Sequence, residues 1–452
     1  MTMYVRGKYE LAELDEDAHP TGHRLTEFEV REAYGNRVIA ELRTDLSAVL
    51  LSSRGNIEKA IRDQRAAIGI SVGSLARATD FDEGVIRQVE ENAAAIPIQH
   101  LEQIAFILGL DERFLALEED ARADRALRVR LRVLLQEAGA ETAMQRRRIT
   151  PQVALKLSEA ASITRTQIRL QKWLDIPDEK HQFATSSDYG DVQHPAWKVG
   201  YQLAEQARSI LELGRAPITS MRALVERRIG IPVLQFELPS EIAGATVASG
   251  ADRGIALNLS GQNTNVWVRR ATLAHELGHI LFDPDEQLNS IRVDRYSEAE
   301  KDPESPGFDD YAEQRANAFS IAFIAPPEGV RERITPPASS ASVIDMMHHY
   351  GLGRVAATYH VANVFYRQYD APSASELHAG PRDEQIAAES FTIDFFQPAA
   401  TPVQRRGRFA VLVTKAFDAG LIAEDSAAAY LRCSTNELQN NLGFLRDIAS
   451  GE

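Results

Sequence analysis

The pattern of apolar positions predicts a series of short helices in the first quarter of the chain. Apolar residues recur at helical spacing in four short segments, 56–69, 71–80, 82–93 and 98–110. Gly69 ends the first segment, and Ser71 and Asp82 stand where the N-caps of the next two helices are expected. Short helices joined by a tight turn are typical of a helix-turn-helix domain, which we place at 53–118.

Further along the chain, the pattern predicts a short group of strands between helices. Three runs favour β-structure because they are rich in branched apolar residues and are separated by Pro or Gly: 231–238, 242–249 and 254–260. Helical spacing marks the segments on either side: 196–214, 220–230, 269–283, 311–326 and 342–369. The acidic, proline-containing stretch 284–312 predicts a surface loop.

The chain is therefore expected to be multidomain and mostly α-helical, with one small β-sheet. We expect five parts. The first three are an N-terminal segment to which the pattern assigns no role (1–52), the helix-turn-helix domain (53–118) and a basic helical segment with a second helix-turn-helix-like pattern (119–177). They are followed by the domain that holds the sheet (196–368) and a C-terminal helical domain (385–452).

The composition indicates which class of protein this is and which residue types could bind a metal ion. The 452 residues are 44% hydrophobic and 25% charged, which is ordinary for globular proteins. No apolar run reaches the roughly 18 to 20 residues that span a bilayer, and the N-terminus lacks the pattern of a secretory signal. We therefore expect a cytoplasmic location and no membrane contact. Because Cys433 is the single cysteine, an internal disulfide and thiolate zinc ligands are excluded, and His, Asp and Glu remain as metal ligands.

The charge is distributed unevenly. The formal net charge of −15 argues against general nucleic-acid binding, but residues 122–172 hold twelve basic residues against four acidic ones. This passage is the expected site of DNA binding, and the candidate contacts are Arg146, Arg147, Arg148, Arg165, Gln167, Arg169 and Lys172. The alternative interpretation is that these side chains pair with the many acidic residues of the chain.

The segment 269–283, RRATLAHELGHILFD, combines an amphipathic helix with a potential metal site. His275 and His279 are four residues apart, so both imidazoles lie on one helical face, as a tetrahedral zinc ion requires of two ligands from one element. Glu276 lies between them, where a carboxylate can reach a metal-bound water without being a ligand. The alternative is an ordinary helix with solvated or hydrogen-bonded histidines.

A zinc site of this kind needs a third protein ligand. The extended motif with a third histidine requires glycine at position 282 and histidine at 285, but the chain has Phe282 and Asp285. Asp283 lies one turn further along the face of the two histidines. Glu313 is the better candidate because it begins a second amphipathic helix, although a glutamate there can equally be a solvated surface charge.

The stretch from Gln202 to about Arg367 resembles the ImmA/IrrE family of zinc metallopeptidases. The matching pieces are YQLAEQARSILEL, IGIPVLQFELP, GIALNLS, RRATLAHELGHILFD and EQRANAFSIAFIAP. The resemblance implies an α+β, zincin-like peptidase domain in which His275, His279 and Glu313 bind Zn²⁺ and Glu276 is the general base. The chain departs from the family in the long acidic insertion after Phe282.

Residues 56–116 resemble the Xre/Cro-type helix-turn-helix domain. The helix expected to read DNA, 82–92, carries four acidic residues against the single Arg87, so phosphates would repel it. We therefore expect this domain to serve in dimerisation or partner contact. A homodimer is accordingly one expected assembly.

Three functions fit these features. The first is a regulatory zinc endopeptidase that cleaves a protein partner, such as a repressor or antitoxin-like protein, in response to stress or foreign DNA. The second is a transcription regulator whose peptidase fold acts as a sensor or scaffold, and the third is an antitoxin-like binding protein. Retention of His275, Glu276, His279 and Glu313 favours the endopeptidase, since a scaffold has no use for Glu276.

Overall fold

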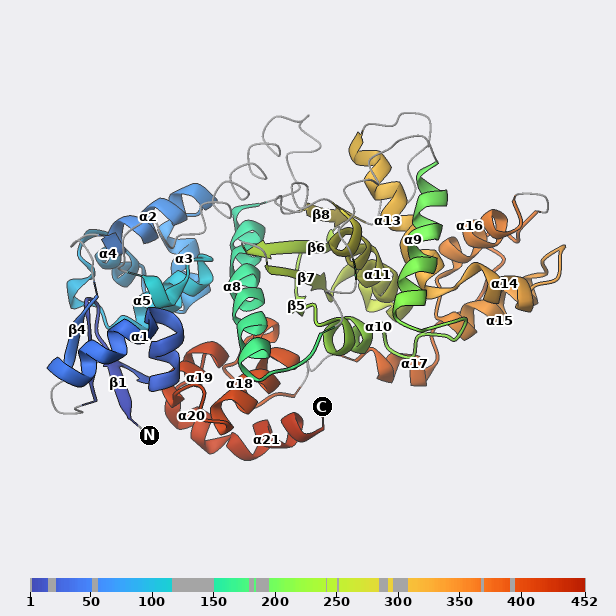
Figure 1. The fold of residues 1–452 in the computed structure, drawn as a ribbon. Coiled ribbons are helices and arrows are strands. Elements are labelled where there is room, and N and C mark those ends of the chain that lie inside the picture. Colours follow the sequence, from blue (N-terminus) through green and yellow to red (C-terminus); the bar gives the residue numbers. More distant parts are fainter. Residues whose placement is uncertain are drawn as a thin grey trace. The chain divides into compact units, whose positions relative to one another are not determined.

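The chain folds into two compact units in the computed structural model (Figure 1). Unit 1 comprises Met1–Ile176, Ala248–Asp252 and Thr392–Glu452, and unit 2 comprises Pro177–Val247 and Arg253–Phe391. The structure describes residues 2–14, 22–50, 56–115, 150–178, 183, 195–240, 242–249, 252–283, 292–295, 308–366, 370–390 and 395–451. Most of these residues are helical, as the mostly α class predicted, and they include two small sheets where one was expected. None of the helices described there is both long and apolar enough to cross a bilayer.

Unit 1 begins with an antiparallel sheet, in the segment to which the sequence pattern assigned no role. Its strands, in the order β3-β1-β2-β4, are β1 (Met3–Arg6), β2 (Glu10–Glu13), β3 (His23–Thr26) and β4 (Ser47–Val49). Helix α1 (Glu27–Asp45) follows β3 directly because Thr26 forms a capping box with Glu29. The Thr26 hydroxyl accepts from the Glu29 amide at 3.1 Å, and the Glu29 carboxylate accepts from the Thr26 amide at 2.9 Å.

The four helices predicted between residues 56 and 110 are present. They are α2 (Asn56–Ile68), α3 (Val72–Thr79), α4 (Glu83–Glu91) and α5 (Ile98–Ile107). Ser71 caps α3 by accepting from the Ser74 amide at 3.1 Å, whereas Asp82 stands at the N-cap of α4 without a side-chain hydrogen bond there. The helix-turn-helix identity of this module stays a prediction.

The other helices that the structure describes in unit 1 come from segments that are far apart in the chain. The helices are α8 (Pro151–Trp173), α18 (Arg408–Asp418), α19 (Glu424–Leu431), α20 (Thr435–Asn440) and α21 (Leu442–Ser450). A buried ion pair of 2.8 Å joins Arg405, just before α18, to Glu159 on α8. The parts that we expected as separate domains at 1–52, 53–118 and 119–177 thus form one unit with the C-terminal helices.

The sheet of unit 2 contains the three predicted strand runs. Its order is β5-β7-β6-β8, with β5 (Val233–Phe236), β6 (Ile242–Ser249), β7 (Asp252–Asn258) and β8 (Arg292–Arg295). The fourth strand, β8, lies within the stretch 284–312, where only a surface loop was expected, and it pairs antiparallel with β6. Strand β7, which contains most of the run 254–260, lies inside the sheet between β5 and β6, so it is not an edge on which an extended substrate could pair.

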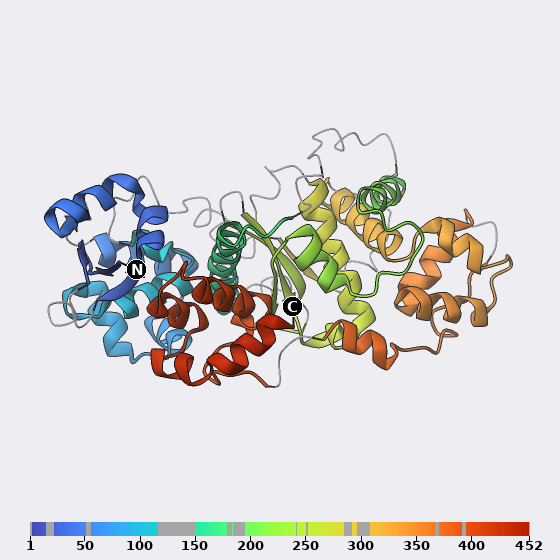
Figure 2. The ribbon, with the colours of Figure 1, turned by 60° about the horizontal axis from the view of Figure 1, so that its bottom comes forward.

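The helices of unit 2 are α9 (Ala196–Ile210), α10 (Met221–Ala223, continued by a π-helical turn, Leu224–Ile229), α11 (Val266–Phe282), α13 (Phe308–Ile324), α14 (Pro327–Arg333), α15 (Ser340–Tyr350), α16 (Arg354–Val364) and α17 (Asp383–Ala388). Helices α9, α11 and α13 lie side by side (Figures 1 and 2). Unit 2 extends beyond the expected limit at 368, since Glu389 forms a buried ion pair of 2.6 Å with Arg270 of α11.

The crossing of α11 and α13 depends on a glycine. The ring of Phe319 on α13 lies so close to Gly278 that a Cβ atom there would be 2.7 Å from Phe319 Cδ1. Phe319 is buried and in turn stacks on Phe323 and contacts Phe282 edge to face. Gly278 therefore sets how closely the two helices approach.

We expect Gly278→Ala to destabilise unit 2 by about 1–3 kcal/mol, because the added methyl group forces Phe319 out of its packed position. Urea unfolding followed by circular dichroism measures this loss. The matched control is Gly380→Ala, where a Cβ meets nothing within 4 Å. Equal unfolding midpoints for the two variants would contradict the close crossing.

Candidate metal centre

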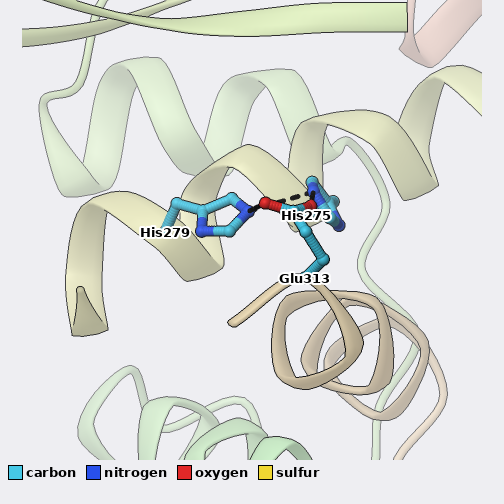
Figure 3. Close-up of side chains that lie close together, drawn as sticks. All are labelled: His275, His279 and Glu313. Carbon is cyan, nitrogen blue, oxygen red and sulfur yellow. Dashed lines mark hydrogen bonds and ion pairs between the residues drawn. The ribbon is translucent and has the colours of Figure 1, made fainter. Parts of the chain in front are cut away.

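Helix α11 places the two histidines on its buried face. Asn265 caps the helix by accepting from the Trp267 amide at 2.9 Å, and the helix then remains buried along most of its length. The side chain of His279 is fully buried and His275 is 7% exposed. Their Nε2 atoms are 3.1 Å apart, so both imidazoles are directed at the same point (Figure 3).

Helix α13 brings Glu313 to that point from a distant part of the sequence. Glu313 Oε2 lies 3.3 Å from His275 Nε2, and Oε1 lies 3.5 Å from His279 Nε2 (Figure 3). Zinc–nitrogen and zinc–oxygen bonds of about 2.0–2.1 Å at tetrahedral angles put neighbouring ligand atoms about 3.3 Å apart. The observed separations match, so the three side chains fit a zinc ion with one coordination position left open. In the described part of the chain, these three residues are a group of side chains that could hold a metal ion.

Asp283 and Arg315 fix the orientation of His279. Asp283 Oδ2 accepts from His279 Nδ1 at 2.7 Å, and Asp283 Oδ1 accepts from the Arg315 guanidinium. With Nδ1 protonated by this bond, the lone pair of Nε2 is directed at the metal position. Asp283, considered above as a ligand, thus contacts the far nitrogen of a ligand instead.

Mutual attraction controls the charges of this cluster. Burial alone lowers the pKa of His279, but Glu313 and Asp283 outweigh it and raise this pKa to about 9. Burial opposes the charge of Glu313 as well, yet His279 and His275 hold the pKa of its carboxyl group well below its usual range. Glu313 is therefore an anion at neutral pH, and a metal ion displaces a proton from His279 when it binds.

Glu276 occupies a buried position between α11 and the sheet. Its side chain is fully buried, and its Oε2 accepts from the Thr246 hydroxyl on β6 at 2.8 Å. Gly244, on the same strand, makes room for it, because a Cβ there would lie 2.9 Å from Glu276 Oε1. Sequence reasoning missed Thr246, since one threonine within a strand run carries no signal of its own.

Four other His and Tyr side chains of the stretch that resembles the peptidase family, His349, Tyr350, Tyr359 and His360, lie where a second donor to a substrate would be sought. His360 is buried between the Tyr201 hydroxyl, 2.5 Å from Nδ1, and the Ala325 carbonyl, 2.7 Å from Nε2. The Tyr350 hydroxyl donates to the Arg215 carbonyl at 3.2 Å. His349 packs edge to face against Tyr350, and Tyr359 is exposed. The contacts of His360 and Tyr350 are those of structural residues.

Some of the residues predicted to contact nucleic acid lie in the described part of the chain and others do not. Arg146, Arg147 and Arg148 lie outside the described residues. On α8, Gln167 is fully buried, Arg169 pairs with Glu112 at 3.3 Å, and Arg165 lies 3.7 Å from Asp111. Lys172 is exposed near the end of α8. The buried side chains give the nucleic-acid interpretation no support, and it stays a prediction.

Comparison with known families agrees with this site. Residues 262–361 match the family model described as the IrrE N-terminal-like domain, Peptidase_M78. The matched stretch includes α11, α13 and all three ligand candidates together with Glu276. It supports the resemblance to the ImmA/IrrE family and indicates a peptidase-type domain, while the helix-turn-helix module lies outside the match. No curated protein matches the chain.

We expect Asp283→Asn to weaken zinc binding about 10- to 100-fold, because a neutral amide orients His279 less firmly and makes it a weaker ligand. Competition with a chromogenic chelator measures the affinity. His279→Ala should abolish tight binding, whereas the exposed Asp345→Asn is the matched control. Unchanged affinity in Asp283→Asn would contradict the role given to the carboxylate.

His360 predicts a pH dependence of stability. Burial lowers its pKa to about 4 from the ordinary value of 6.5. His360 is therefore protonated at a lower pH in the folded state than in the unfolded state. The neutral His360 side chain therefore makes its full contribution to the free energy of unfolding above pH 6.5. This free energy falls by up to about 3 kcal/mol as the pH is lowered from 6.5 to 4.

Urea unfolding at pH 4.5 and 7.5 tests this prediction by comparing wild type with His360→Gln. The variant should lose less stability than wild type between the two values, and the exposed His378→Gln should behave like wild type. An identical loss in wild type and His360→Gln would contradict it.

Proposed function

We propose that unit 2 is a zinc-dependent endopeptidase that cleaves a protein partner, of the repressor or antitoxin-like kind. The observation that carries the proposal is the convergence of His275, His279 and Glu313 at tetrahedral separations, with Glu276 directly beside the two histidines in sequence. A scaffold needs neither this ligand geometry nor a buried carboxylate at position 276. The match to a peptidase family points the same way.

Three residues of the chain have distinct roles in the proposed hydrolysis: Glu276, Thr246 and Asp283. A bound zinc ion would supply Lewis acidity and lower the pKa of a coordinated water towards neutrality. Glu276 accepts the proton of the attacking water and passes it to the leaving amine. Thr246 holds the Glu276 carboxylate through the 2.8 Å hydrogen bond, so the base is oriented before substrate arrives. Asp283 keeps His279 in the tautomer that binds metal.

The alternative, a transcription regulator or antitoxin-like binder with a peptidase fold, is favoured by the helix-turn-helix pattern. Control by nucleic acid belongs to the same set of hypotheses and rests on the basic passage 122–172. The two functions differ in one respect, since only the endopeptidase requires the carboxylate of Glu276.

We expect Glu276→Gln to lower proteolysis by about 10²–10⁴-fold while zinc content stays at the wild-type level, because the amide cannot accept a proton. Labelling of new protein N-termini in the native cell extract measures cleavage, with and without single- and double-stranded DNA. The matched control is Glu205→Gln on the exposed side of α9.

New termini that appear with wild type and Glu205→Gln, but not with Glu276→Gln, would identify the substrate. Termini that appear equally with Glu276→Gln would refute the proposed base. Their absence under every condition, with zinc bound, would favour the regulator.

A further inference from the structure

Unit 1 contains a small cavity among buried charges that the peptidase site does not use. Its volume is about 50 Å³, and it lies between the N-terminal sheet, α1, α5, α8 and α19. At roughly 10–15 Å³ for each water, this volume holds about three to five waters, comparable with a small organic acid. The walls carry charged groups of both signs, among them Arg6, His23 and Glu102, together with the aromatic rings of Tyr34, Phe106, Trp173 and Tyr430.

Arg6 presents an open pair of donors at this cavity. The residue is 2% exposed, and its Nη1 donates to Glu102 Oε1 at 2.8 Å and to the Glu112 carbonyl at 2.7 Å. Within the described part of the chain, its Nε and Nη2 have no hydrogen-bond acceptor. These two N–H groups lie on one edge of the guanidinium, which is the edge that binds a carboxylate in bidentate fashion. Buried donors of a cation require such an acceptor.

Glu102 and Glu29 are directed at other partners, and Glu112 is engaged through one carboxylate oxygen, while its Oε2 has no hydrogen bond within the described part of the chain. Glu102 also binds His23, with Oε2 2.5 Å from Nδ1. The Glu112 carboxylate faces Arg169 at 3.3 Å. The Glu29 carboxylate accepts from the amides of Thr26 and Ala423, both at 2.9 Å. None of these carboxylates accepts from Nε or Nη2 of Arg6, so this edge of the guanidinium is open to an acceptor from outside the chain.

We propose that this cavity binds a small monocarboxylate whose two oxygens accept from Nε and Nη2 of Arg6. The single negative charge of a monocarboxylate matches the one open pair of donors on Arg6. Glu29, Glu102 and Glu112, which line the cavity, would repel a dianion such as phosphate. Phe106 and Trp173 suit a short apolar body on the acid. Because the walls come from β1, α5 and α19, the bound acid stabilises the association of three segments that are distant in the chain.

Titration calorimetry of the full-length chain with acetate, propionate, pyruvate, acetamide and inorganic phosphate tests the proposal. We expect one of the three acids to bind at one per chain, with a Kd below about 1 mM. Arg6→Lys keeps the charge but lacks the two-donor edge, so it should weaken binding at least tenfold. Arg43→Lys, exposed on α1, is the matched control. The measurement requires neither zinc nor proteolysis, so its outcome is independent of the proposed function.

A second pair of variants protects the test against misfolding of Arg6→Lys. Ala33 lines the cavity, so Ala33→Leu fills it while Arg6 stays intact, and Ala40→Leu changes an exposed position of the same helix. Loss of binding in Ala33→Leu alone supports the site. The proposal is overturned if no acid binds to wild type, if acetamide or phosphate binds as well as the acids, or if Arg6→Lys and Arg43→Lys bind equally.

Discussion

The close crossing of α11 and α13 is the constraint on which the candidate site depends. The two histidines come from one helix and Glu313 from the other, so their convergence requires a fixed distance and register between the helices. Gly278 and Phe319 set the distance by direct contact. The ion pair between Arg315 and Asp283 fixes the register, because it joins α13 to the residue that ends α11. Packing and electrostatics thus determine the same arrangement.

The buried charges of this arrangement are tolerated because they pair. His279 and Asp283 are fully buried or nearly so, and removing their charges from water is unfavourable unless they pair. Asp283 is satisfied by His279 and Arg315, and Glu313 lies within 3.5 Å of both imidazoles, whose attraction keeps its carboxyl group ionised. Two of these paired side chains, His279 and Glu313, are also ones that the proposed zinc ion would contact.

The sequence predicted those parts of the fold and site that depend on local spacing. The i, i+4 histidines, the three strand runs and the helices between residues 56 and 110 follow from periodicity and capping, and the structure contains them. Glu313 required the family resemblance, since nothing local separates it from a solvated glutamate. Thr246, Asp283 as an orienting group, and the pairing of β6 with β8 depend on tertiary contacts that no local pattern encodes.

The largest difference between the expected and the observed structure is in the bounds of the domains. The domain that holds the sheet was expected to end at residue 368 and the C-terminal domain to begin at 385, yet Gln385 and Glu389 bind Trp267 and Arg270 of α11. Likewise, the N-terminal sheet and the C-terminal helices belong to one unit because buried pairs such as Arg405–Glu159 join them. Contacts over such separations are invisible to composition and to the period of apolar residues.

The division of unit 1 between the two ends of the chain has a consequence during synthesis. Unit 2 is complete once the ribosome has added Phe391, whereas unit 1 still lacks the helices that follow Thr392. Domains generally fold as they emerge. Unit 2 therefore acquires its structure before the first 176 residues have their final partners, and a nascent chain that has emerged only as far as residue 391 holds a folded unit 2 together with an incomplete unit 1.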